Sequence, residues 1–219
     1  MPKPKKSNTN QIRINAGVWR SRVIKFADGD GLRPTPDRVR QTLFNWLGQE
    51  LTGKTCLDLF AGTGALGFEA ASRNAKSVTM IELASSAIAA LRQNLALLNG
   101  SDSKLNGFAI QDSKLNGFAI QDSKLNGFEL PKNIQILQQD ALQFLANNVE
   151  NFDVIFCDPP YNKGWLDKLL PQLKQHLAPN GMAYVEAEFE LTSSEDWQVK
   201  KSGKAGAVYY HLLSLVIPA

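Results

Sequence analysis

The stretch LDLFAGTGALG, from Leu57 to Gly67, decides the fold. An apolar run enters it, three glycines follow at close spacing, and a helical pattern of apolar residues continues after it. This order predicts a strand, a tight turn and a helix. The missing side chains of Gly62, Gly64 and Gly67 let the backbone approach a ligand, and a helix N-terminus offers free N–H groups. The stretch therefore predicts a nucleotide-binding turn, although such glycines can also simply close a strand onto a helix.

Asp58 makes this prediction more specific. A carboxylate near the end of the strand would repel the pyrophosphate of a dinucleotide and would attract a ligand that carries positive charge. S-adenosylmethionine carries both a sulfonium and an ammonium group. We therefore expect this cofactor at the turn, because Asp58 would have no role in a nicotinamide-dependent dehydrogenase.

Strand and helix patterns alternate from Thr55 onward, which predicts an α/β fold with a doubly wound, mostly parallel sheet. A Gly-Lys loop should join the last two strands as an antiparallel pair. We expect a further helix that begins with Thr35 as N-cap and Pro36 in its first position. The expected strands lie within residues 55–60, 77–83, 134–140, 152–161, 181–189 and 196–216, and the expected helices include 67–73, 85–98 and 165–177.

Acidic residues occupy four successive strand ends, where ligands bind in such sheets. Besides Asp58, Glu82 can accept both ribose hydroxyls of a nucleoside. Asp140 can accept an adenine amino group, cap the following helix, or do both. Asp158 opens the segment DPPY. Solvated loop carboxylates are the alternative explanation for the set.

In DPPY, two prolines fix the backbone so that the Asp158 carboxylate and a neighbouring carbonyl converge on one point. Two converging acceptors suit an NH2 group. Tyr161 then offers an aromatic face on which a planar base or amide can stack.

The N-terminal end is basic. The net charge is +3, but the first forty residues hold ten Lys or Arg and three acids, whereas the rest holds 14 and 18. We expect this end to face a polyanion, although a solvated tail would look the same. Residues 1–10 are expected to be a disordered tail, residues 11–34 a β-hairpin extension, and residues 35–219 the main domain. The candidate phosphate-binding side chains are Arg20 and Arg22 beside Trp19, and Arg33, Arg38 and Arg40 around the helix start.

A chain of 219 residues with 43% hydrophobic composition can bury one substantial core. It holds no apolar run long enough to span a bilayer and no apolar segment after its N-terminal lysines, so we expect a cytoplasmic protein. Cys56 and Cys157 lie in apolar runs and should be buried thiols. Together with His176 and His211 they lack the spacing of metal ligands, so we expect no metal site.

A ten-residue unit repeats between the 85–98 helix and the next strand. DSKLNGFAIQ occupies residues 102–111 and 112–121, and DSKLNGFELP follows at 122–131. Each copy has an Asn-Gly turn signal between Leu and Phe, which would allow transient hairpins. We interpret residues 102–131 as a duplicated surface insertion, two copies of which are dispensable, with a protein-contact role as the alternative.

The chain resembles the class I S-adenosylmethionine-dependent methyltransferases, and more closely the RsmD family, which methylates the N2 amine of a guanine in small-subunit (16S) ribosomal RNA. The resemblance runs nearly end to end, and only the triple repeat departs from it. It covers RINAGVWRSRVIKF, GLRPTPDRVRQTLFNWL, LDLFAGTGALGFEAASR, DPPY and KAGAVYYHLL.

This resemblance implies a Rossmann-like, seven-stranded sheet and S-adenosylmethionine as cofactor. It implies a guanine held by Asp158 and the Pro159 carbonyl, with Pro160 and Tyr161 completing the catalytic segment. It also implies an assembled or assembling 30S particle as substrate and a monomeric enzyme. The implied cofactor contacts are Asp58, Phe60, Gly62, Gly64, Glu82, Asp140 and Ala141.

Several alternatives stay open from the sequence. A DNA adenine or a protein glutamine could be the methylated amine, although the chain has no separate target-recognition domain and carries Asp where we associate Asn with the glutamine enzymes. A non-catalytic RNA-binding assembly factor is a further alternative, which the intact strand-end acids disfavour.

Overall fold

The computed structural model describes most of the chain, and the descriptions below refer to this part. The described residues are 9–27, 34–100, 124–125, 128–129, 133–161 and 163–216. Within these ranges, no helix is both long and apolar enough to cross a membrane.

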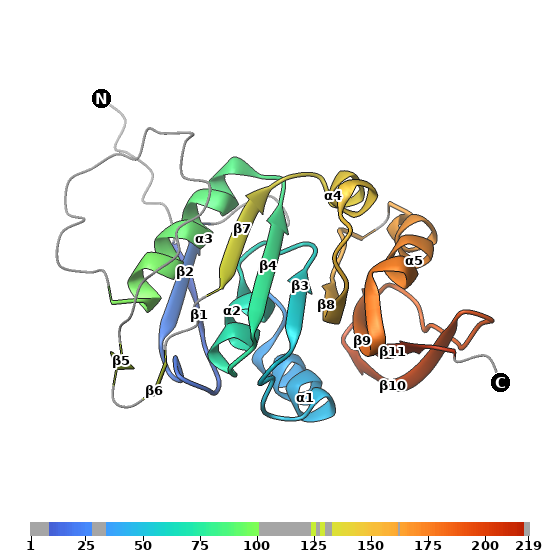
Figure 1. The fold of residues 1–219 in the computed structure, drawn as a ribbon, viewed down its shortest axis with the longest axis horizontal. Helices are drawn as coiled ribbons and strands as arrows, with labels where there is room; N and C mark the ends of the chain where they lie inside the picture. Colours follow the sequence, from blue (N-terminus) through green and yellow to red (C-terminus); the bar gives the residue numbers. More distant parts are fainter. Residues whose placement is uncertain are drawn as a thin grey trace.

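A seven-stranded sheet forms the centre of the molecule, in the order β10-β11-β9-β8-β3-β4-β7 (Figure 1). The five strands from β7 to β9 are parallel to one another, β11 pairs with β9 in the antiparallel sense, and β10 pairs with β11 in the same way. The expected α/β architecture is confirmed. The strands are β3 (Thr55–Asp58), β4 (Ser77–Glu82), β7 (Ile134–Gln138), β8 (Phe152–Cys157), β9 (Leu177–Ala187), β10 (Trp197–Ala205) and β11 (Val208–Leu215).

Both faces of the sheet are covered, which explains the nearly continuous apolar runs in its parallel strands. Successive residues of a strand point to opposite faces. Cys56 accordingly packs in the core on one face, and Leu57 and Cys157 pack in the core on the other. Both cysteines are buried free thiols, as expected.

Helices divide between the two faces. The first three contribute to one core and the last two to the other. The helices are α1 (Asp37–Leu47), α2 (Ala65–Ser72), α3 (Ser85–Leu98), α4 (Ala141–Asn147) and α5 (Trp165–His176). His176 ends α5, in agreement with its expected place at a helix end.

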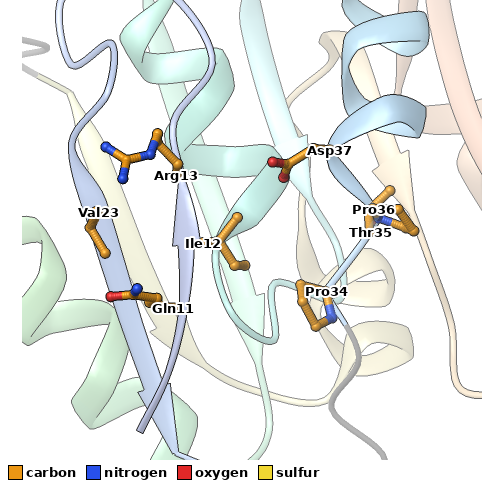
Figure 2. Close-up of a pocket in the computed structure, with 8 residues that line it drawn as sticks. All are labelled: Gln11, Ile12, Arg13, Val23, Pro34, Thr35, Pro36 and Asp37. Atoms are coloured by element: carbon orange, nitrogen blue, oxygen red, sulfur yellow. The ribbon is translucent and has the colours of Figure 1, made fainter.

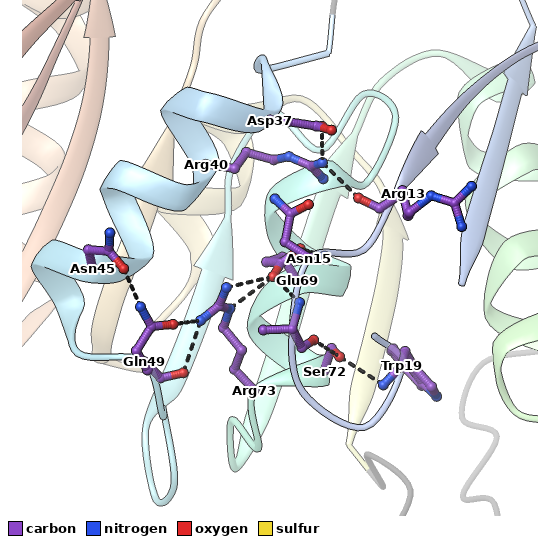
Figure 3. A network of polar contacts seen from close by, with 11 residues as sticks. Arg13, Asn15, Trp19, Asp37, Arg40, Asn45, Gln49, Glu69, Ser72 and Arg73 are labelled. Atoms are coloured by element: carbon purple, nitrogen blue, oxygen red, sulfur yellow. Dashed lines mark hydrogen bonds and ion pairs between the residues drawn. The ribbon is translucent and has the colours of Figure 1, made fainter. Parts of the chain in front are cut away.

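The N-terminal hairpin of β1 (Thr9–Arg13) and β2 (Val23–Ala27) is antiparallel and packs on the main domain. Strand β1 begins at Thr9, so it includes the last two residues of the expected tail, and residues 1–8 lie outside the described residues. The side chain of Glu69 in α2 accepts hydrogen bonds from the N–H groups of Asn15 and Ala16 at 2.8 and 3.1 Å (Figure 3). Trp19 is 1% exposed and packs edge-on against Phe68. The hairpin therefore shares its core with the domain.

Three predicted details are wrong. Thr35 does not cap α1, which begins at Asp37 after Pro36, because the Thr35 hydroxyl donates to Glu186 instead. The strand predicted at 181–189 begins earlier, since β9 starts at Leu177. Its pairing with β8 is irregular between Leu177 and Met182. The turn between β10 and β11 lies at Gly206, which has a φ of +64°, and not at the earlier Gly-Lys pair.

The third repeat copy contains a short antiparallel hairpin. Strands β5 (Lys124–Leu125) and β6 (Phe128–Glu129) pair with Leu125 opposite Phe128, so Asn126 and Gly127 lie between them in sequence. The expected hairpin is confirmed for this copy. Residues 102–123, with the first two copies, lie outside the described residues.

Candidate active site at the carboxyl ends of the strands

The site lies where the direction of sheet winding reverses, between β3 and β8. Strand β3 pairs with β4 on one side and with β8 on the other. Ligands of open α/β sheets bind outside the carboxyl ends of the strands at such a switch point. Asp58 ends β3 and Asp158 directly follows β8. The sheet thus brings together two of the predicted acids.

Asp58 is nearly inaccessible, with 3% of its surface exposed. Its Oδ2 accepts the backbone N–H of Gly67 in α2 at 2.9 Å, which ties the strand end to the first turn of the helix. Burial raises its pKa to about 7, and the nearby Glu82 charge acts in the same direction, whereas the N–H groups of Gly67 and Phe60 oppose the shift.

The glycine turn has the backbone that its residues predict. Gly62 and Gly64 have φ of +48° and +81°, in the left-handed region. A Cβ on Gly64 would lie 2.5 Å from Phe68 and 2.6 Å from Leu91. A Cβ on Gly67 would meet Met80 at 2.8 Å, so Gly67 allows α2 to pack closely on β4.

Glu82 faces this turn from the next strand. Its Oε2 accepts the N–H of Gly62 at 2.9 Å, and its Oε1 accepts those of Leu83 and Ala84 at 2.8 and 2.7 Å. These bonds fix the carboxylate beside the glycines.

The other predicted cofactor residues border the same edge. Asp140 caps α4, since its Oδ1 accepts the N–H of Gln143 at 3.0 Å, so its capping role is confirmed. Ala141 is buried in the first turn of α4. Phe60 is partly buried and meets Trp165 edge-on, with ring centroids 5.5 Å apart.

The last three residues of the DPPY segment form one wall of a pocket of about 50 Å³. Pro159 and Pro160 line it, together with the ring of Tyr161, which is 38% exposed, and Phe189, which is 54% exposed. Burial raises the pKa of Asp158 well above its ordinary value, and the charges of Glu186 and Asp58 add to this shift.

Glu186 belongs to the site and was missed by the sequence analysis. It is 4% exposed in β9 and also lines the DPPY pocket. The register pairs Cys157 with Val185, so Asp158 and Glu186 follow side by side on adjacent strands. The rule that selected the other strand-end acids would have found Glu186 if it had been applied to this fifth parallel strand.

Besides burial, neighbouring charges raise the pKa of two of these carboxylates, Glu82 acting on Asp58, and Glu186 and Asp58 acting on Asp158. A site with such unrelieved negative charge favours a cationic ligand and disfavours a pyrophosphate. The residues therefore fit S-adenosylmethionine, with its ammonium and sulfonium groups, better than a nicotinamide dinucleotide.

A larger hollow of about 250 Å³ lies between the N-terminal hairpin and the segment that leads into α1 (Figure 2). Gln11, Arg13 and Val23 line it from the hairpin, and Pro34–Asp37 line it from the segment that leads into α1. Thr35 links the two places, because it lines this hollow and donates to Glu186 at 3.2 Å.

The predicted RNA-binding arginines have different surroundings. Arg20 and Arg38 are exposed. The guanidinium of Arg22 donates to the carbonyls of Leu97 and Leu98 at 2.6 and 2.8 Å, so it caps the C-terminus of α3.

Arg40 does not suit an RNA contact, because its side chain is fully buried. It donates to the Arg13 carbonyl at 2.8 Å and pairs with Asp37 (Figure 3). It therefore ties α1 to the hairpin, and this part of the prediction is wrong. Arg33 lies outside the described residues.

Known proteins resemble this chain over nearly its full length. A ribosomal RNA small subunit methyltransferase D of Escherichia coli is 36% identical over 97% of this chain and 94% of its own length. The protein of the same name from Haemophilus influenzae is 36% identical over 92% of this chain and 93% of its own.

Solved structures share the fold. The putative methyltransferase yhhF from Escherichia coli is 36% identical, with a TM-score of 0.70 over 93% of this chain and 97% of that one. A Thermus thermophilus 16S rRNA N2 methyltransferase, solved with AdoMet and guanosine, shares the fold at 19% identity, with a TM-score of 0.64 over 98% of this chain and 52% of that one.

The family model described as Conserved hypothetical protein 95 matches residues 12–117 and 111–214. The two matches overlap inside the triple repeat, as expected if the repeat is an insertion into the family's fold. The chain therefore belongs to this family, the RsmD family of ribosomal RNA small subunit methyltransferases with the class I methyltransferase fold.

Proposed function

We propose that the protein transfers a methyl group from S-adenosylmethionine to the exocyclic N2 amine of a guanine in small-subunit (16S) ribosomal RNA. One observation carries this proposal: Asp158 lies at the switch point of the sheet, between Asp58 and Glu186, and opens a segment whose Tyr161 ring is partly exposed at a pocket. The names of the full-length relatives support ribosomal RNA as the substrate class.

The acids beside the glycine turn would hold the cofactor. Asp58 would pair with its ammonium group, and Glu82 would accept its ribose hydroxyls next to Gly62. Phe60, Asp140 and Ala141 border the place for the adenine. When bound, S-adenosylmethionine supplies an electrophilic methyl group on a positively charged sulfur.

The DPPY segment would hold the amine. Its nitrogen is a poor nucleophile because its lone pair is delocalised into the ring, so orientation must lower the barrier. The Asp158 carboxylate and the Pro159 carbonyl would accept its two N–H groups, and Tyr161 would stack on the flipped base. The raised pKa of Asp158 makes its carboxylate a better acceptor for the proton that the amine nitrogen loses.

The RNA would lie across the hairpin and the start of α1. Arg20 and Arg38 are exposed there, and the hollow between the two elements adjoins Thr35. We further propose that the substrate is an assembled or assembling 30S particle, and that the enzyme acts in the cytoplasm as a monomer.

Two arginine variants separate RNA binding from stability. Arg20→Ala should weaken binding of the ribosomal RNA and lower the salt dependence of the binding constant, because a phosphate contact is lost. Arg22→Ala should lower the free energy of unfolding by about 1–2 kcal/mol, because two α3 carbonyls lose their donor. Filter binding at several salt concentrations and urea denaturation measure the two effects. This division would be contradicted if Arg20→Ala lowered the stability and Arg22→Ala weakened RNA binding.

The reaction is tested with small subunits from a strain that lacks the protein. The purified protein and labelled S-adenosylmethionine should label the RNA, and nucleotide mapping should place the label on N2 of a guanine. Label in DNA or protein but not in RNA would favour an adenine or glutamine methyltransferase. No label with intact cofactor binding would favour an assembly factor.

Asp158 is tested in a single turnover. Asp158→Ala should slow methyl transfer by about a hundredfold or more, while S-adenosylhomocysteine binding stays measurable. Asp196→Ala is the matched control, since Asp196 is an exposed acid paired with Lys174 on the surface. Turnover by Asp158→Ala near that of the control would rule out the role of Asp158.

A further inference from the structure

Glu186 joins three segments that are distant in the sequence. Its Oε1 accepts the hydroxyl of Tyr184 at 2.8 Å and that of Thr35 at 3.2 Å. Its Oε2 accepts the hydroxyl of Tyr161 at 3.2 Å. These donors come from β9 itself, from the segment before α1, and from the DPPY segment.

A buried carboxylate is costly unless hydrogen bonds satisfy it. Glu186 is 4% exposed and lies beside Asp158 on the neighbouring strand, so a second negative charge adds to that cost. An apolar side chain at position 186 could be buried without this cost. The three hydroxyls therefore point to a role for the carboxylate that an apolar residue in β9 could not provide.

The two oxygens of Glu186 face partners of different kinds. Tyr184 is fully buried and Thr35 is 7% exposed, so the bonds to Oε1 lie within packed protein. Tyr161 is 38% exposed at the pocket wall, so a bond to its hydroxyl restrains a ring that faces open space.

The Tyr161 hydroxyl remains a donor in this place. Burial and the charges of Asp158 and Glu186 raise the pKa of Tyr161 above its ordinary value. The phenol therefore keeps its proton at neutral pH and can donate it to Oε2.

We propose that Glu186 is a positioning residue that holds the ring of Tyr161 in the orientation needed to stack on the target guanine. This inference rests on the proposed function. Tyr184 and Thr35 fix the carboxylate through Oε1, and Oε2 fixes Tyr161. Thr35 also lines the hollow beside the hairpin, so the same carboxylate connects the expected RNA-binding face to the stacking ring.

A double-mutant cycle in single-turnover methylation tests the inference. Glu186→Ala and Tyr161→Phe should each lower the rate by about tenfold, equal to about 1.4 kcal/mol. The double variant should be no slower than the slower single variant, because both substitutions remove the same hydrogen bond between Glu186 and Tyr161. If the two rate reductions instead multiply in the double variant, the inference is overturned.

Three further arms separate positioning from a purely structural role. Glu186→Gln should recover most of the rate, because its amide oxygen still accepts hydroxyl donors. S-adenosylhomocysteine affinity should be unchanged in every variant. Glu190→Ala, which changes an exposed acid on the same segment, should retain the full rate. Equal loss of cofactor affinity and rate in Glu186→Ala would overturn the inference.

Fluorine NMR decides the point without methyl transfer. In protein labelled with 3-fluorotyrosine, Tyr161→Phe assigns the Tyr161 resonance. Glu186→Ala should shift it toward that of free fluorotyrosine, whereas Glu190→Ala should leave it in place. An unshifted resonance would overturn the positioning role.

Wild-type protein that labels no RNA would instead overturn the proposed function, and this spectrum would still report whether Glu186 holds the ring. If Glu186→Ala does not fold, Tyr161→Phe alone tests the inference, because an unchanged methylation rate in that variant would overturn it.

Discussion

The carboxylates at the strand ends differ in the number of hydrogen bonds that they accept from the protein itself. Glu82 accepts three backbone N–H groups, whereas Oδ2 of the more deeply buried Asp58 accepts that of Gly67. Burial raises the pKa of Asp58 to about 7, and the Gly67 N–H offsets only part of this rise. A bound cation would favour its charged form, so proton release and cofactor binding should be linked.

We therefore expect cofactor affinity to depend on pH through Asp58. Below a pKa of about 7 the carboxyl is neutral and pairs poorly with an ammonium group. The affinity for S-adenosylhomocysteine should rise with pH and level off above that value, changing by up to about tenfold per unit below it. Calorimetric titrations across this range measure the effect.

Asp58→Asn should bind weakly with a flatter pH profile, whereas Asp196→Asn should follow the wild type. A wild-type affinity that is constant across the range, or that falls as pH rises, would contradict the expectation.

At the scale of elements, the structure is organised by how α2 meets its neighbours. Asp58 binds the N–H of Gly67, and Gly64 adopts a left-handed φ just before the helix. At the other end of the helix, Glu69 and Ser72 hold the N-terminal hairpin. One short helix thus connects the cofactor turn to the expected RNA-binding extension.

The steric demand on the glycine turn is measurable by comparison with another left-handed glycine. Gly164→Ala should cost about 1 kcal/mol, because φ is +58° there but nothing lies within 4 Å of a Cβ. Gly64→Ala should cost at least about 2 kcal/mol more, since its Cβ would overlap Phe68 and Leu91. Urea denaturation measures both, and equal losses would show that packing around Gly64 yields freely.

The attachment of the hairpin depends on a buried ion pair. Glu69 accepts Arg73 at 2.9 Å, and both side chains are at most 3% exposed (Figure 3). Glu69→Ala should lower the free energy of unfolding by about 3–5 kcal/mol, because it leaves the Arg73 charge buried without its partner. Glu50→Ala, which removes an exposed acid bonded to Asn74, should cost under about 1 kcal/mol in the same urea experiment. Similar losses would contradict the proposed attachment.

For the whole molecule, the site depends on the order of the strands and not on the insertion. In sequence, the insertion connects α3 to the first residue of β7, the edge strand, whereas the site lies at the carboxyl ends of β3 and β8. Its length should therefore matter little for stability or for catalysis.

Deletion of residues 102–121 tests this point. The variant keeps the third copy with its hairpin and should retain the single-turnover rate of the full chain. Shortening the connection should raise the free energy of unfolding by no more than about 1 kcal/mol, since loop-closure entropy changes slowly with length. A loss of RNA methylation with unchanged stability would instead indicate a contact role for the repeat.

Local sequence was sufficient for the features that depend on neighbouring residues. The strand–turn–helix at Leu57–Gly67, the alternation of strands and helices, the Asp140 cap and the Asn-Gly hairpin were all predicted and are observed. Each follows from residues within a few positions of one another, because backbone torsions and short hydrogen bonds set it.

The tertiary structure alone decided which polar side chains face ligand and which serve the fold. Thr35 has the chemistry of an N-cap, and Arg22 and Arg40 that of phosphate ligands. Their partners are Glu186, the α3 carbonyls and Asp37. Most of these partners lie far away in the sequence. A side chain binds the nearest partner in space, and strand order, which no local pattern encodes, sets that distance.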